Sequence, residues 1–284
     1  MTGLFTATFA GVGGPPQASA WSPYKLPRFY QWYDAQNSSS LTISVLGSVV
    51  QWDGQQQQVA SLAGTAVNGA VVNPTGINGF QSITVGANRG FTNDSSYGLS
   101  FLAGATGASV IVVAKILTRP LSFGAGNFFF QYAAGVGFPT YSRLSLYGYP
   151  GNLGGEYGAN YEQIDGDYQQ SSFSSPDGVL PINTPVIMRL SMDYTAGIGE
   201  LFLSNVSDTV PVNTNTHLVT PIGGATGAVS PAPSLWCDIA GGSHSVKNQS
   251  IVADIGDMIM VKSVLGSTDV TNLNAFLRSK WHIS

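Results

Sequence analysis

The residues best suited to chemistry are acids and tyrosines gathered between residues 141 and 168. The run EQIDGD brings Glu162, Asp165 and Asp167 close together. Carboxylates this close could share acid–base work or supply some of the roughly six to eight oxygens that Ca²⁺ prefers. Gly166 and the polar neighbours favour a solvated turn instead, and the spacing matches no EF-hand loop. We therefore expect no catalytic group and no dedicated metal site, with Ca²⁺ the one cofactor left open.

Tyrosine is concentrated in the same stretch, which holds six of the 12 tyrosines of the chain. In RLSLYGY, alternation would turn Leu144 and Leu146 toward the core and Tyr147 and Tyr149 to the other face. A tyrosine ring offers a flat apolar surface with a hydrogen-bonding tip, which suits sugars and protein partners alike. Three interpretations stay open: contact between subunits, glycan capture and plain packing. The candidate glycan- or partner-binding residues are Tyr147, Tyr149, Tyr157, Tyr161, Asp165, Asp167 and Tyr168.

The remaining reactive groups are scattered. His217, His244 and His282 lack the spacing of a zinc site, so we expect no zinc. Cys237 is the single cysteine, which excludes a disulfide within the chain, and the run SLWCDIA predicts a buried thiol in a strand. Neither a Gly-x-Ser-x-Gly elbow nor a Walker-type glycine loop is present in the sequence.

Charge is scarce in this chain. Charged residues make up 9% of the 284 residues, against about 25% in an average soluble protein. A surface wetted by neutral polar residues suits extracellular, particle-bound or adhesive proteins. With 11 Lys+Arg against 15 Asp+Glu, there is no basic stripe for nucleic acid. No apolar run approaches the roughly 20 residues of a membrane helix, so we expect no membrane insertion.

Residues 1–28 are rich in Gly, Pro, Ala and Ser, which predicts an extended N-terminal arm. Because no Lys or Arg precedes Lys25, we expect a retained arm and no export signal. A surface-type protein without such a signal would leave its cell by assembly into a virus particle. The arm could bind a neighbouring subunit or form a disordered tail, and Trp21 is its expected anchor on a partner.

Residues 29–284 predict a single β-sandwich domain, because strand-like runs alternate with Pro and Gly punctuation. In VIMRLSMD, Met188, Leu190 and Met192 share one face, which predicts a half-buried antiparallel strand. The run at 109–116 is apolar on both faces, as is typical of a central strand. The expected strands cover residues 41–45, 49–53, 97–102, 109–116, 127–132, 142–149, 186–193, 199–204, 235–240 and 250–262.

One amphipathic helix is predicted at residues 267–281. Ser267 or Thr268 could cap its first turn, and Asp269 is placed favourably there. Its apolar residues fall at helical spacing, which predicts a buried stripe made of Val270, Leu273, Leu277 and Trp281. The tryptophans expected in cores are Trp32, Trp52, Trp236 and Trp281.

The order of these segments resembles the concanavalin A-like lectin/glucanase jelly roll in its laminin-G-like form, which is common in phage virion proteins and secreted bacterial proteins. The segments that carry the resemblance are FYQWYDAQNSSSLTIS with VVQWDG at 29–54, NPTGINGFQSI at 73–83, SVIVVAK at 109–115, IMRLSMDYTAGIGELFLSN at 187–205 and the closing strand and helix at 255–283. The resemblance implies an all-β, antiparallel jelly-roll β-sandwich with one short C-terminal α-helix. In the family that this chain resembles, glucanases carry a Glu-x-Asp-x-x-Glu motif on one strand. This sequence lacks that motif.

From these features we expect a non-enzymatic phage virion protein, such as a head decoration, fibre or tail-tip component on the surface of an extracellular particle. It would contact other virion proteins and form a homo-oligomer, with a trimer suggested by analogy with phage fibres. It could also display a face that binds a host surface glycan. The alternative is a free carbohydrate-binding lectin module, and a third hypothesis is a glycoside hydrolase with an unrecognised carboxylate pair.

Overall fold

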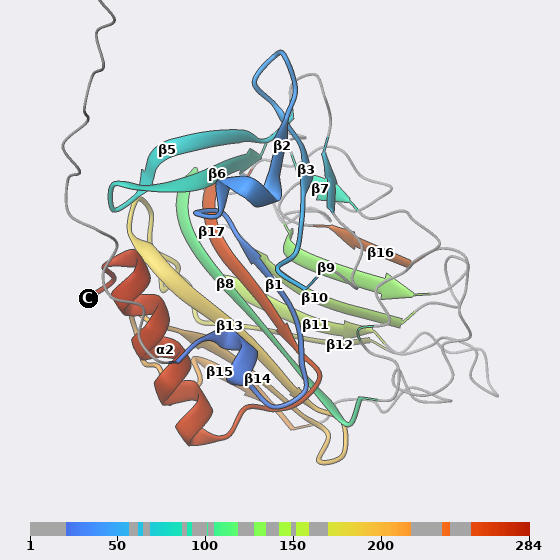
Figure 1. Cartoon of the computed structure of the whole chain (residues 1–284). Coiled ribbons are helices and arrows are strands. Elements are labelled where there is room, and N and C mark those ends of the chain that lie inside the picture. Colours follow the sequence, from blue (N-terminus) through green and yellow to red (C-terminus); the bar gives the residue numbers. More distant parts are fainter. Residues whose placement is uncertain are drawn as a thin grey trace, which may run out of the picture.

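In the part of the chain that the structure describes, three antiparallel sheets and one α-helix form the fold (Figure 1). The computed structural model describes residues 21–56, 62–64, 69–86, 90–92, 101, 105–118, 128–134, 142–148, 152–158, 170–216, 235–238 and 251–284. The helix α2 (Ser267–Trp281) lies on the outside of the largest sheet. This confirms the predicted all-β sandwich with a C-terminal helix. Within the described part of the chain, no helix has the length and hydropathy needed to cross a bilayer.

The largest sheet has β17 at its centre. Its strands run in the order β15 (Asn213–Asn215), β14 (Ile198–Leu203), β13 (Pro185–Asp193), β8 (Gly107–Thr118), β17 (Val252–Val261), β6 (Phe80–Gly86) and β5 (Val71–Ile77). A further strand, β1 (Phe29–Asp34), also pairs with β17. The register places Ile255 opposite Ile83 of β6, and Asp257 opposite Asp34 of β1. The strands β6 and β1 therefore share one edge of β17.

The second sheet has five strands in the order β12 (Gln170–Ser174), β11 (Leu153–Gly158), β10 (Ser142–Gly148), β9 (Phe128–Ala134) and β16 (Leu235–Asp238). A small third sheet joins β2 (Leu41–Ile43), β3 (Val49–Trp52), β4 (Leu62–Gly64) and β7 (Phe91–Thr92). Two 3₁₀ turns, η1 (Pro23–Lys25) and η2 (Ser38–Ser40), flank β1. The predicted strand at 97–102 lies outside the described residues, apart from Phe101.

The main core lies between the two large sheets. Alternate residues of β8 and β17 meet Leu144 and Leu146 of β10 there, and both leucines are buried as their alternation predicted. Trp52 is also fully buried in this core, as expected. Burial of such apolar side chains is the dominant favourable contribution to folding.

A second core lies between α2 and the outer face of the large sheet. The predicted stripe of Val270, Leu273, Leu277 and Trp281 is buried here and packs on apolar residues of β8, β13 and β17. Trp32 joins the same core, as expected. The predicted cap is wrong, because the helix begins at Ser267 and its N-cap is Gly266, which has no side chain to accept a hydrogen bond.

The strand β13 is buried on both faces, so the predicted half-burial is wrong, although the alternation is correct. Its second face is covered because Arg189 lies 3.5 Å over the ring of Phe202 and donates to the Asp208 carbonyl at 3.2 Å. Burial lowers the pKa of Arg189 to about 10. The helix and the segment after β14 therefore replace the solvent expected on this face.

Gly256 is the tightest contact between the large sheet and α2. A Cβ atom at this position would lie 2.6 Å from Cζ2 of Trp281. Gly256→Ala should therefore lower the free energy of unfolding by about 1–3 kcal/mol, because the tryptophan has to move out of a close-packed core. Urea unfolding followed by tryptophan fluorescence measures the change.

The matched control is Gly266→Ala, where the new Cβ would meet its nearest atom, the Asp269 carboxylate, at 3.8 Å. This variant should lose about 1 kcal/mol or less, the cost of alanine at an N-cap. Equal losses in the two variants would contradict the steric argument.

Candidate functional site

The predicted tyrosine surface divides between the two faces of the five-stranded sheet. Tyr147 lies in β10 and Tyr157 in β11, and directly paired residues of antiparallel strands share one face. The register pairs Tyr157 with the core residue Leu144, whereas it pairs Tyr147 with Gly154. Only Tyr147 therefore occupies a position on the outer face, which we define as the face turned away from the main core. The other candidates lie outside the described residues: Tyr149, Tyr161, Asp165, Asp167 and Tyr168.

A row of hydrogen-bonding residues crosses all five strands on this outer face. Since Leu144 and Leu146 face the core, Ser145 between them occupies the outer face. Its direct partners on both sides, and their partners in turn, must share that face. These residues form what we call the outer row: Asp238, Gln131, Ser145, Glu156 and Ser172.

The neighbouring row contains Trp236, which pairs with Ala133, the partner of Arg143. The register therefore gives Trp236 an outer-face position in β16, and its predicted burial stays a prediction. Cys237 pairs with Tyr132, the partner of Leu144, and so takes a core-face position in β16, while burial of its thiol stays a prediction.

Glycines border the outer row on β11. Gly154 and Gly158 flank Glu156 at the next outer-face positions along the strand. Because glycine has no Cβ, these two positions carry no side chain beside Glu156. Glu156 and Asp238 are separated by three strand spacings, about 14 Å. The paired carboxylates of glycoside hydrolases lie roughly 5–9.5 Å apart, which is less than this backbone spacing.

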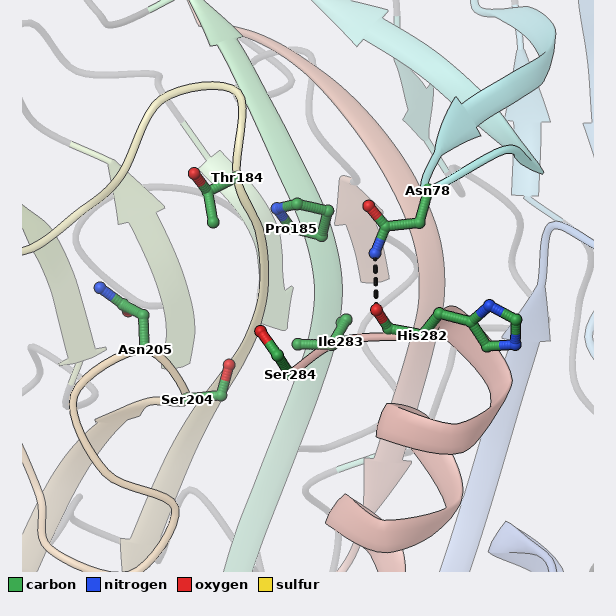
Figure 2. Close-up of a pocket in the computed structure, with 8 residues that line it drawn as sticks. All are labelled: Asn78, Thr184, Pro185, Ser204, Asn205, His282, Ile283 and Ser284. Carbon is green, nitrogen blue, oxygen red and sulfur yellow. Dashed lines mark hydrogen bonds between the residues drawn. The ribbon is translucent and has the colours of Figure 1, made fainter.

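A separate polar pocket of about 490 Å³ lies at one end of the large sheet (Figure 2). Four segments far apart in the sequence line it: the β5–β6 turn, the start of β13, the end of β14 and the residues after α2. Its polar lining consists of Asn78, Thr184, Ser204, Asn205, His282 and Ser284. Of the outer-row residues, none lines this pocket.

A buried carboxylate fixes α2 beside the pocket. Asp257 accepts hydrogen bonds from the indoles of Trp32 at 2.7 Å and Trp281 at 2.6 Å, and from Lys280 at 2.8 Å. Lys280 also pairs with Asp34 at 2.7 Å. Burial raises the pKa of the Asp34 carboxyl, and the nearby Asp257 raises it further, against the opposing effect of Lys280. We assign this cluster a structural role, because its carboxylates, indoles and ammonium group form hydrogen bonds and ion pairs with one another.

Asp254 is the second buried acid of β17. It accepts from Thr84 at 2.5 Å and from Asn73 at 3.2 Å, and it pairs with Lys115 at 3.5 Å. Lys115 also donates to the Gly76 carbonyl. Across the described ranges, no three His, Cys, Asp or Glu side chains lie close enough to hold a metal ion. The acids at 162–167, on which Ca²⁺ was left open, lie outside those ranges.

Trp21 packs on its own chain, with its ring centroid 5.7 Å from that of Phe276 in α2. Leu26, further along the same segment, is buried in the second core. Residues 21–28 of the predicted arm are thus held against the helix. The role of Trp21 as an anchor on a partner stays a prediction.

No family model matches this chain, and no curated protein sequence matches it. Solved structures do resemble it. Trypanosoma rangeli sialidase in complex with sialic acid matches with a TM-score of 0.54 and 13% identity over 90% of this chain and 34% of the sialidase. The binding domain of Botulinum Neurotoxin DC in complex with SialylT matches with a TM-score of 0.54 and 11% identity, over 90% of this chain and 52% of that domain.

The binding domain of Paraclostridial Mosquitocidal Protein 1 also matches, with a TM-score of 0.53 and 9% identity, over 88% of this chain and 52% of that domain. The chain thus spans about a third of the sialidase and about half of the toxin domains. Identities this low show the fold alone, an all-β sandwich. None of these three structures is named for a concanavalin A-like lectin or a phage protein, so that resemblance stays a prediction.

The expectation that the chain is not an enzyme is contradicted by these comparisons. Several of the similar structures are sialidases, which are enzymes. The absence of a familiar catalytic motif from the sequence is therefore no ground for excluding catalysis on a sandwich of this kind.

The raised pKa of Asp34 leads to a testable dependence of stability on pH. The folded pKa lies above the unfolded value, so protonation favours the fold, and this contribution is lost as the pH rises through the folded pKa. Relative to Asp34→Asn, the wild-type chain should therefore lose free energy of unfolding from about pH 4 upward. Denaturant unfolding of both proteins at several pH values measures this difference, and parallel curves would contradict it.

Proposed function

We propose that the chain is a carbohydrate-binding module and that the outer row is its glycan-binding surface. The observation that carries the proposal is the row itself: five directly paired positions on one sheet face, each with a carboxylate, amide or hydroxyl group. Sugar hydroxyls both donate and accept hydrogen bonds, and bonds to ionised acceptors are the strongest of them. Tyr147 and Trp236 occupy outer-face positions beside the row, where aromatic rings could pack on the apolar faces of sugars.

The comparisons support this proposal at the level of fold. Trypanosoma rangeli sialidase was solved in complex with sialic acid, and the Botulinum Neurotoxin DC binding domain in complex with SialylT. Sandwiches of this kind therefore occur in proteins that hold glycans.

The charges of the outer row favour uncharged sugars over sialic acid. Glu156 and Asp238 both belong to the row, while Arg143 lies in the neighbouring one. A carboxylate on the ligand would meet carboxylates of the same sign, whereas neutral sugar hydroxyls can donate to them. We therefore expect neutral oligosaccharides to bind more tightly than their sialylated forms.

An array that carries matched neutral and sialylated oligosaccharides tests the proposal, followed by calorimetry with the best binder. Glu156→Gln should weaken binding about tenfold or more, because it removes a charged acceptor of ligand hydroxyls. The variant should unfold at the same denaturant concentration as the wild type, since position 156 faces away from the main core.

The matched control is Glu200→Gln on β14 of the other large sheet, which makes the same change in charge away from the outer row. Its affinity should equal that of the wild type. Equal loss in both variants would indicate an effect of net charge alone. Absence of binding to every glycan on the array would overturn the proposed function.

A place on a virion or another extracellular particle remains our proposal for the location of the protein. It rests on the neutral polar composition, with 9% charged residues, and on the sequence resemblance described above. Contacts with virion proteins and a homo-oligomer, such as a trimer, are predictions on the same basis. Imaging of purified particles with a labelled antibody would test the location.

A further inference from the structure

The polar pocket of Figure 2 has walls that are fixed before any ligand arrives. The amide nitrogen of Asn78 donates to the carbonyls of Trp281 and His282, both at 2.9 Å. The hydroxyl oxygen of Ser204 accepts from the Ile187 amide at 2.9 Å. The β5–β6 turn, α2 and β14 are thereby tied together around one hollow, and a rigid site loses little entropy on binding.

Arg278 adds further hydrogen bonds that link α2 to the end of β14 and the segment after it. It donates to the Ser204 carbonyl at 3.1 Å and forms two bonds with the Asp208 carboxylate, at 3.1 and 3.0 Å. A two-pronged arginine–carboxylate pair has a defined geometry as well as favourable energy. The positive charge of Arg278 is thus paired with the Asp208 carboxylate, and Arg278 is not among the residues that line the pocket.

The lining leaves hydrogen-bonding groups available to a ligand. The side-chain nitrogens of Asn78 and Asn205 are both engaged, the latter on the Val179 carbonyl at 3.1 Å. Each amide is therefore oriented, and within the described part of the chain neither Oδ1 atom has a hydrogen-bond partner. In Figure 2 the Oδ1 of Asn78 points toward Pro185, across the hollow. Two oriented acceptors require a ligand with donors.

The remaining lining groups narrow the class of ligand. No Asp, Glu, Lys or Arg side chain is among the described residues that line the pocket. The His282 ring is turned away from the hollow and packs on Phe80, with 4.7 Å between ring centroids, and the Ser284 oxygen accepts a hydrogen bond from Arg278. Pro185 and Ile283 add apolar surface between the polar groups. A ligand that presents hydroxyl donors together with C–H surface, without charge, matches this lining.

We propose that this pocket is a second binding site, which takes an uncharged sugar unit or similar polyol. The hydroxyl groups of the ligand donate to the carbonyl oxygens of Asn78 and Asn205, and its C–H face packs on Pro185. The site lies on the large sheet and shares no residue with the outer row, so it does not depend on the proposed function of that row.

Amide NMR spectra of the full chain test the proposal, with methyl glucoside, methyl galactoside, methyl mannoside and glycerol as probes. We expect saturable shifts of the Asn78 and Asn205 side-chain signals below about 50 mM of at least one probe. Asn205→Ala should weaken that binding about fivefold, because one oriented acceptor is lost. Thr184→Trp should abolish it by filling the hollow.

Thr209→Ala is the matched control, because Thr209 is exposed nearby but does not line the pocket. It should bind the probe as the wild type does. Glu156→Gln should also leave the pocket signals responsive, which separates this site from the outer row. Absence of any shift with all the probes would overturn the proposal, as would unchanged affinity in both pocket variants while thermal unfolding shows them folded.

Discussion

The buried carboxylate of Asp257 is the interaction on which the arrangement of sheet and helix depends. A carboxylate cannot leave water without partners, and here two indoles and one ammonium group supply them. These donors come from β1 and α2, whereas the carboxylate comes from β17. Removing either neighbour would leave a buried charge uncompensated, so the three elements hold one geometry together.

Both candidate surfaces inherit their shape from this framework, though in different ways. The pocket forms only because the end of α2 is held over the sheet, where Asn78 can meet the carbonyls of Trp281 and His282. The outer row depends instead on strand register: a shift by one residue would send Ser145 and Glu156 to the core face. The first surface depends on contacts between distant segments, and the second on pairing between neighbouring strands.

The sequence predicted those features that local periodicity determines. The stripe on α2, the alternation of β13 and the core positions of Leu144 and Leu146 all follow from spacing alone. It could not show what covers β13, because Arg189 is buried by a segment that begins after β14. Nor could it show which strand pairs with β16, because β9 lies about a hundred residues earlier in the chain.

The candidate sites were less accessible to sequence reasoning. The register gives Tyr147 the strand position that its alternation with Leu146 predicted, but the partners of Ser145 come from strands whose pairing no local pattern reveals. The pocket draws on four separate segments, and in the sequence Asn78 stood out only as part of the segment at 73–83.

The position of β17 also bears on how the protein folds during synthesis. This strand lies at the centre of the large sheet, yet it follows all the other strands of that sheet in the chain. Until it emerges, β8 and β13 have no partner that joins them to β6 and β1, and the two parts of the sheet remain apart. Until β17 is synthesised, the edges of β1, β6 and β8 that it pairs with stay open, and unpaired strand edges favour aggregation.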